Sequence, residues 1–347
     1  METPKRIDIR SLTLAELQTQ LMAFGEPGFR AKQVYQWLWE KTCTNFDEMS
    51  NLSKSLRETL KTQFEICAVK IHQSQISEDR TIKNSFKLYD GNLVEGVLIP
   101  TTERMTACVS SQVGCSLTCK FCATGYMDRK RNLNADEIFD QVVLIAKQAE
   151  QNYKLALSNI VYMGMGEPLL NYANVLRSIE RITAEDGLNM SYKRITVSTA
   201  GIAKMIKKLG DDGVKFNLAL SLHAANNAKR SAIMPINDSN PLEDLSEALN
   251  YFYQKTKRKI TLEYAVMNDT NDGSQEAKEL IRFAKKIPCK VNLIEYNPID
   301  KARFEKPDAV KVDQFMDYLS KNRVNARLRR SRGKDIDAAC GQLANKG

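Results

Sequence analysis

The sequence contains no long hydrophobic run. Its apolar stretches, such as Leu218 to Leu222, fall far short of the roughly 18 to 20 residues that cross a bilayer. Met1 to Arg10 also lacks the apolar core that a secretory signal requires. Glycine and proline are scarce, at 16 and 9 of 347 residues, which excludes collagen-like and low-complexity chains. We therefore expect a globular cytoplasmic protein without a membrane partner.

Histidine is also scarce, because His72 and His223 are the only two, whereas there are eight cysteines. In a reducing compartment, so many cysteines indicate metal or redox chemistry before structural disulfides. Basic residues outnumber acidic ones by 51 to 42, which suits a polyanionic partner. Six basic residues fall between Arg323 and Lys334. That stretch has two open interpretations, a phosphate-binding patch and a solvated strand edge.

The chain is long enough for two or three domains. Residues 1–65 predict a small helical domain, with amphipathic helices over Leu14 to Phe24, Lys32 to Trp39 and Leu52 to Phe64. Residues 66–100 predict a strand over Ile66 to His72 and a β-hairpin that turns at Asp90-Gly91. The hairpin strands are Thr81 to Leu88 and Leu93 to Pro100. Glu95 lies on the second of them.

Residues 101–333 alternate short apolar strands with amphipathic helices, the pattern of a parallel α/β sheet. The predicted strands are Thr106 to Ser111, Asn159 to Met163, Arg194 to Ser198, Phe216 to Ser221, Ile260 to Val266 and Lys290 to Glu295. The predicted helices are Asn134 to Gln151, Tyr172 to Thr183, Leu242 to Thr256, Ser274 to Ile287 and Ala309 to Asn322. Asn134 and Glu137 have the spacing of a helix-starting capping box. Six units predict a partial (β/α)6 barrel, with its chemistry in the loops after the strands.

Three cysteines, Cys115, Cys119 and Cys122, are spaced C-x3-C-x2-C in the loop after the first barrel strand. A structural zinc site requires four protein ligands, and no nearby histidine or second cysteine pair completes this one. Three thiolates on a 4Fe–4S cluster instead leave one iron without a protein ligand, free to chelate a small molecule. The spacing therefore favours an iron–sulfur cluster with an open iron.

This motif, with Phe121 before its last cysteine, resembles that of the radical S-adenosylmethionine (SAM) superfamily. The resemblance implies a 4Fe–4S cluster held by the three cysteines. It further implies that SAM binds the open iron and is cleaved to a 5′-deoxyadenosyl radical. An electron donor such as flavodoxin or ferredoxin would supply the electron.

The later loops supply candidate cofactor ligands. Gly166 and Glu167 follow the second strand, where glycine permits close backbone approach and the carboxylate can accept from the methionyl amino group. The remaining candidates at strand ends are Ser198, Ser221, Leu222, His223 and Asn297. Taken singly, each could instead be an ordinary loop-start hydrogen bonder. Together they favour a cofactor site at the carboxyl edge of the sheet.

Four segments carry a closer resemblance, to the family of dual-specificity adenosine-C2 RNA methyltransferases. They are Val109 to Cys115, Gly164 to Asn171, Met234 to Asn237 and Asp335 to Leu343. The resemblance implies methylation of C2 in adenosine 2503 of 23S rRNA and adenosine 37 of certain tRNAs. It also implies that the helical domain is an accessory RNA-binding module.

Two cysteines outside the cluster motif gain a role from this resemblance. In that family the residue matching Cys340, in the C-terminal segment 334–347, takes a methyl group from one SAM molecule. A second SAM supplies the radical that turns this methyl into a methylene radical, which adds to C2. The residue matching Cys108 then forms a transient disulfide with it. Glu95 matches the proton acceptor, although Cys108 is an alternative for that role.

Two other functions stay open at this point. A Cfr-type C8 adenosine methyltransferase shares the superfamily, but the run from Glu167 to Asn171 has the C2-type form Glu-Pro-Leu-Leu-Asn. A non-catalytic iron–sulfur or zinc RNA-binding protein is the alternative from a different class. Cys43, Cys67 and Cys289 are interpreted as small buried hydrophobic residues.

Overall fold

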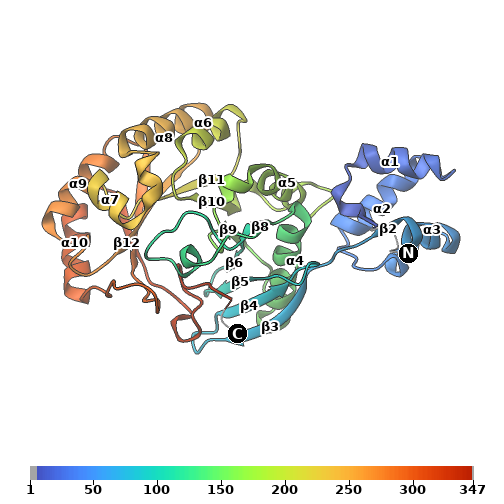
Figure 1. Ribbon diagram of the computed structural model, residues 1–347, viewed down its shortest axis with the longest axis horizontal. Coiled ribbons are helices and arrows are strands. Elements are labelled where there is room, and N and C mark those ends of the chain that lie inside the picture. The colour runs from blue at the N-terminus through green and yellow to red at the C-terminus, as the bar shows by residue number, and fades with distance from the viewer. Residues whose placement is uncertain (1–5, 346–347) are drawn as a thin grey trace.

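The computed structural model describes residues 6–345 and has an α/β fold (Figure 1). Within these residues a ten-stranded sheet runs in the order β14-β13-β12-β11-β10-β9-β6-β5-β4-β3. The strands in this order are β14 (Ala326–Arg329), β13 (Cys289–Glu295), β12 (Ile260–Val266), β11 (Asn217–Ser221), β10 (Ile195–Thr199), β9 (Asn159–Tyr162), β6 (Met105–Cys108), β5 (Leu93–Pro100), β4 (Ile82–Lys87) and β3 (Lys70–Ile76). No helix in this part of the chain is both long and apolar enough to cross a bilayer.

The parallel part of the sheet confirms the predicted partial barrel. All six predicted strands are present as β6 and β9 to β13, each paired in parallel with the next. A seventh parallel strand, β14, extends the sheet beyond β13. It comes from the basic stretch, and Ala326–Arg329 forms an edge strand of the sheet. Its alternating arginines hid it, because they break the apolar run that marks the other barrel strands.

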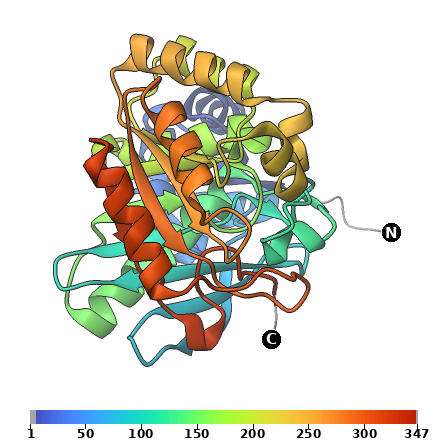
Figure 2. The same ribbon diagram turned by 90° about the vertical axis from the view of Figure 1, so that its left-hand side faces the viewer.

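The helices of the barrel cover the outer face of the sheet, as the orange and red helices in front of the strands show (Figure 2). They are α4 (Ala135–Tyr153), α5 (Tyr172–Thr183), α6 (Ala203–Asp211), α7 (Asn227–Ile233), α8 (Leu242–Thr256), α9 (Ser274–Ala284) and α10 (Ala309–Lys321). The predicted capping box of Asn134 and Glu137 starts α4. Only α6 and α7 were not predicted, and they are the two shortest, too short for a clear helical period.

The predicted hairpin is confirmed by the antiparallel pairing of β4 and β5, and Glu95 lies on β5. The hairpin joins the barrel directly, because β5 pairs antiparallel with β6. The strand predicted over Ile66 to His72 instead spans Lys70–Ile76, after a short segment that leaves the helical lobe. The predicted boundary between hairpin and barrel thus falls inside one continuous sheet.

The helical lobe comprises α1 (Leu14–Ala23), α2 (Phe29–Trp39) and α3 (Lys54–Gln63), beside the short pair β1 (Ile7–Asp8) and β2 (Phe64–Glu65). It lies at one end of the molecule, against α4 and α5 (Figure 1). Buried Arg10 reaches α4, where it ion-pairs with Asp136 and Asp140. Trp39 packs edge-on against Phe139 of the same helix. The division into four domains stays a prediction. Its first and last domains include residues 1–5 and 346–347, which lie outside the described residues.

The segment after β14 bridges the gap between the two ends of the open barrel. The backbone N–H of Gly333 donates to Asp79, in the turn between β3 and β4, at 3.0 Å. The Ser77 hydroxyl donates to Asp335 in the same region. The chain then turns inward, where the backbone N–H of Ala123 donates to the carbonyl of Gly341. This path brings Cys340 to the carboxyl end of the barrel.

Candidate active site

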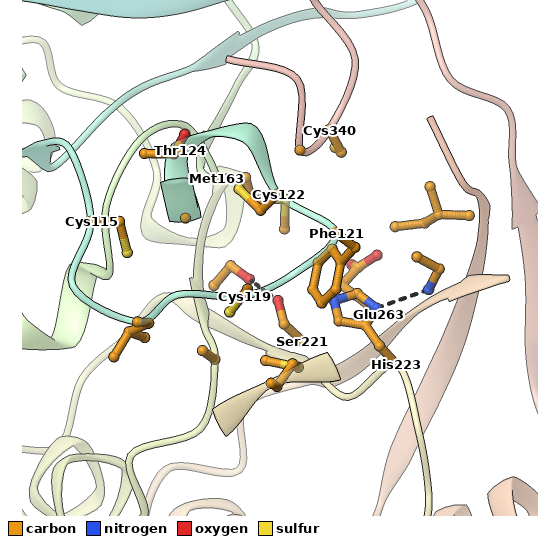
Figure 3. Close-up of a pocket in the computed structure, with 18 of the residues that line it drawn as sticks. Cys115, Cys119, Phe121, Cys122, Thr124, Met163, Ser221, His223, Glu263 and Cys340 are labelled. Carbon is orange, nitrogen blue, oxygen red and sulfur yellow. Dashed lines mark hydrogen bonds between the residues drawn. The ribbon is translucent and has the colours of Figure 1, made fainter. Parts of the chain in front are cut away.

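The three motif cysteines lie on one loop, residues 114–130, which we call the cluster loop. It is closed at its base by β7 (Gln112–Val113) and β8 (Arg131–Asn132), which pair antiparallel. Gly114 has a φ of +75°, and a Cβ there would lie 2.1 Å from the carbonyl oxygen of Asp128. Only glycine permits this closure. The closed loop wraps Cys115, Cys119 and Cys122 around one cavity (Figure 3).

These thiols suit a cluster better than a single ion. Burial raises the pKa of Cys115 to about 11, and it raises the pKa of Cys119 and Cys122 as well. Deprotonated thiols there would therefore require strong compensating positive charge, which bound iron supplies. Among residues 6–345, no group of three or more histidine, cysteine or acidic side chains has the geometry to bind one metal ion. In a cluster each thiolate binds a different iron, so separated thiols fit.

The cavity behind the cluster loop, which we call the upper cavity, opens at the carboxyl ends of the strands. It collects most of the predicted cofactor ligands: Gly166, Glu167, Ser198, Ser221, His223 and Asn297. Leu222 is fully buried and does not line it. Gly166 has a φ of +92°, and a Cβ there would lie 2.4 Å from Gln112 Cβ, so the backbone approaches closely. The upper cavity is therefore shaped by the residues expected to hold SAM.

Glu167 is fixed by backbone donors. Its Oε1 accepts from the N–H of Leu169 at 3.0 Å, and its Oε2 accepts from the N–H of Ala200 at 2.7 Å. Burial raises the pKa of this carboxyl. A bound ammonium group would favour its charged form, which fits the predicted contact with the methionyl amino group.

His223 supports the cluster loop. Its Nδ1 accepts from the backbone N–H of Ala265 at 2.9 Å, drawn as a dashed line in Figure 3. Phe121 meets the imidazole edge-on, with ring centroids 4.5 Å apart. Burial lowers the pKa of His223 to about 3, so the ring stays neutral at physiological pH. The motif aromatic thus rests on a neutral histidine from the end of β11.

Arg230 of α7 ties together the loops that follow β10 and β11. Its guanidinium is fully buried and donates to the carbonyls of Ala200, Ser221 and Leu222. It also donates to Asn237 Oδ1 at 3.0 Å, which gives the segment Met234 to Asn237 a structural role. These bonds fix the two loops that present Ser198 and Ser221.

Replacing Arg230 with alanine is expected to lower the free energy of unfolding by about 3 kcal/mol, because several buried acceptors lose a charged donor at once. Urea unfolding followed by circular dichroism measures the change. Lys208→Ala removes an exposed cation from α6 and serves as the control. An Arg230→Ala midpoint equal to that of the control would contradict this structural role.

Cys340 lies where two cavities meet. It lines the upper cavity and also a second one, the lower cavity, which runs inside the barrel toward the amino ends of the strands. Cys108 lines only the lower cavity, where burial raises its pKa to about 12. The side chain of Asn297 donates to the Cys340 carbonyl at 3.2 Å. Both are free cysteines.

Glu95 is placed differently from the other candidates. It is 1% exposed and lines neither cavity. Its Oε2 accepts the backbone N–H groups of Ala344 and Asn345, at 2.8 and 3.1 Å. Lys83 lies 3.6 Å from its Oε1. Glu95 therefore holds the end of the segment that carries Cys340.

Sequence reasoning missed Glu263 and Arg329, which line both cavities beside Cys340. Asn292 donates to Glu263 Oε1 at 2.9 Å, whereas the buried Oε2 has no hydrogen-bond partner among the described residues. The pKa of Arg329 is raised, by Cys340 above all and then by Glu263. Glu263 could have been found from the sequence, because it is a charged residue inside the otherwise largely apolar strand Ile260–Val266.

Comparison with known proteins agrees with this site. Residues 7–66 match the family described as the ribosomal RNA large subunit methyltransferase N-terminal domain, and residues 109–284 match the radical SAM superfamily. A protein of Cytophaga hutchinsonii, described as a probable dual-specificity RNA methyltransferase RlmN, is 59% identical over 342 residues. That alignment covers 99% of this chain and 94% of the relative.

A second relative of the same description, from Christiangramia forsetii, is 55% identical and covers 99% of this chain and 97% of its own length. The crystal structure of a radical SAM methyltransferase from Sphaerobacter thermophilus superimposes with a TM-score of 0.93 at 39% identity. It covers 98% of this chain and 100% of that one. The resemblance found in the sequence is confirmed, and the chain belongs to the RlmN family of radical SAM RNA methyltransferases.

Proposed function

We propose that the protein methylates C2 of adenosine 2503 in 23S rRNA and of adenosine 37 in certain tRNAs. The names of its relatives, dual-specificity RNA methyltransferases, support two RNA substrates. The observation that carries the proposal is the position of Cys340, at the junction of the upper cavity and the lower cavity that contains Cys108. A thiol at that junction can exchange a group between ligands in the two cavities.

The residues of the upper cavity would hold the cofactors. Cys115, Cys119 and Cys122 would be the three ligands of a 4Fe–4S cluster, and Glu167 would accept a hydrogen bond from the methionyl amino group of SAM. When bound, the cluster and SAM supply methyl groups and a carbon-centred radical, with two SAM molecules used per turnover. A protein of the flavodoxin or ferredoxin class would supply the electron.

Cys340 carries the methyl group. Adenine C2 is electron-poor and does not attack a sulfonium methyl as a thiolate does, so polar transfer to the base is disfavoured. The Cys340 thiolate attacks the sulfonium methyl instead and becomes S-methylcysteine, while the methyl–sulfonium bond breaks and S-adenosylhomocysteine leaves. Arg329 lines both cavities together with Cys340. After a hydrogen atom is removed from the S-methyl group, the resulting methylene radical adds to C2.

Cys108 releases the product. The ring becomes aromatic again while the base is still bonded to Cys340 through the methylene. In this step the C2 proton goes to a base, and one electron would go to the oxidised cluster. The Cys108 thiolate then attacks the Cys340 sulfur and the sulfur–methylene bond breaks. The methylene carbon keeps the bonding electron pair and takes up a proton, so the base leaves with a methyl group. The resulting Cys108–Cys340 disulfide is reduced by an external thiol or electron donor before the next cycle.

We propose Glu95 as the acceptor of the C2 proton. Its carboxylate is bound to the backbone of Ala344 and Asn345, so the C-terminal segment must shift before Glu95 can act as a base. Glu95→Gln is expected to methylate Cys340 normally but to form methylated RNA about 10²-fold more slowly, the usual size of general-base catalysis. Quenched-flow assays with mass spectrometry of the protein and the RNA separate the two steps. A product rate equal to that of the wild type would instead favour Cys108 as the acceptor.

Mass spectrometry of nucleosides tests the overall function. Reconstituted protein is incubated anaerobically with SAM, a reductant and a 23S rRNA fragment that contains adenosine 2503. We expect 2-methyladenosine. A product of 8-methyladenosine would indicate Cfr-type chemistry, and no methylated adenosine with an intact cluster would contradict the proposal.

A further inference from the structure

The lower cavity is open and polar where a barrel is usually filled. Barrel interiors are normally packed with branched apolar side chains. Here several inward positions along the strands are occupied by hydroxyl and amide side chains, namely Thr106, Thr196, Asn217, Thr261 and Asn292, beside apolar ones such as Val161 and Ile294. The cavity has a volume of about 620 Å³ and runs from the thiols of Cys108 and Cys340 to the amino ends of the strands. Its composition indicates a channel for a polar ligand.

Five basic residues surround the amino end of this channel, and we call them the amino rim. Each comes from the start of a different strand or from the residues just before it: Arg104 before β6, Lys193 before β10, Lys259 before β12, Lys290 in β13 and Arg327 in β14. All are exposed except Lys290, which is half-buried. Within residues 6–345, none of the five forms an ion pair within 4.0 Å.

The rim cations are close enough to repel one another. Burial lowers the pKa of Lys290, and Arg327, Lys259 and Arg104 lower it further, whereas Glu263 alone acts in the opposite direction. Unpaired cations gathered at one opening cost free energy unless an anion binds between them. The rim is therefore an anion-binding surface.

The basic surface continues outward from the rim. Lys193 also lines a neighbouring surface hollow, together with Lys215 and Arg258. These residues come from the loops before β10, β11 and β12. The cations thus follow the amino edge of the sheet for several strands, as required for a ligand with repeated negative charges rather than a single phosphate.

We propose that the amino rim binds the phosphodiester backbone of the RNA and that the target adenosine enters the barrel from this end, opposite the cofactor. The inference rests on the proposed function. The four-residue step from Lys259 to Glu263 spans about 13 Å at about 3.3 Å per residue. Phosphates held at the rim would leave an unstacked nucleotide free to extend inward toward Cys340.

The test combines three rim substitutions, Lys259→Gln, Lys290→Gln and Arg327→Gln, in the reconstituted full-length protein. The control carries Lys204→Gln, Lys208→Gln and Lys278→Gln on the outer helices α6 and α9, with the same loss of charge. Fluorescence anisotropy measures binding of a 23S rRNA fragment that contains adenosine 2503, across a salt series. We expect the rim variant to bind at least about 10-fold more weakly. A plot of log affinity against log salt concentration has a negative slope, and we expect the magnitude of that slope to be smaller by about two to three in the rim variant. Each lost phosphate contact reduces the magnitude of the slope by about one.

A second readout separates RNA binding from the chemistry. Methylation of Cys340 by SAM requires no RNA, so it reports folding and cofactor binding in the rim variant. Equal binding and equal salt slopes in the rim and control variants would overturn the proposal. If the unsubstituted protein forms no methylated adenosine, the proposed function fails on that result alone, and the binding comparison still decides whether the rim holds RNA.

Discussion

Replacing Cys340 with alanine is expected to abolish RNA methylation, with product formation falling by more than about 10³-fold, as when a covalent catalytic residue is removed. The reason is chemical, because adenine C2 cannot take the methyl from a sulfonium directly. The cluster should be unaffected, since the three cysteines proposed as its ligands lie on the cluster loop. Mass spectrometry of the nucleosides gives the product yield, and visible absorption of the reconstituted protein reports the cluster.

Cys289→Ala is the matched control for that experiment. Cys289 is also a free, partly buried cysteine, but it starts β13 and lines neither cavity. We expect it to retain the cluster and most of the activity. Intact-protein mass spectrometry should also show a net mass increase of about 14 Da, from methylation by SAM, for the control but not for Cys340→Ala. Residual 2-methyladenosine from Cys340→Ala would exclude S-methylcysteine as the carrier.

The parallel strands and the cluster loop were predictable because their signals are local. Apolar runs such as Ile260 to Val266 mark buried strands, and the cysteine spacing identifies the cluster within eight residues. That side chains such as Glu167 line one cavity follows from the rule that loops at the carboxyl ends of parallel strands meet. In each case neighbouring residues determine the outcome.

The missed features depend on contacts between distant segments. Nothing near Asp79 in the sequence shows that its carboxylate binds Gly333, or that the chain after β14 bridges the open barrel. Likewise, Glu95 looks like an exposed strand residue until the C-terminal segment covers it with two N–H donors. In the sequence Arg329 is only one of several basic residues in a row. Its spatial neighbours Cys340 and Glu263 come from other segments, which only the tertiary fold brings beside it.

Replacing Cys108 with alanine is expected to trap the RNA on the protein. Without the attacking thiol, the methylene link between Cys340 and adenine C2 persists, so released product should fall by about 10²-fold or more while a covalent adduct accumulates. Denaturing gel electrophoresis with labelled RNA detects the adduct, and nuclease digestion followed by peptide mass spectrometry locates it at Cys340. Cys108→Ser should behave in the same way, because a hydroxyl at this buried site does not replace the thiol in attack on sulfur.

The double variant Cys108→Ala/Cys340→Ala tests whether the adduct is attached through Cys340. It lacks the attachment point, so it should form neither adduct nor product, whereas Cys108→Ala alone forms adduct. Methylation of Cys340 should proceed in Cys108→Ala, since Cys108 lines only the lower cavity and takes no part in that step. Free 2-methyladenosine at the wild-type rate from Cys108→Ala would show that something other than this thiol breaks the sulfur–methylene bond. Absence of the adduct despite normal Cys340 methylation would contradict the role of Cys108 in breaking the sulfur–methylene bond.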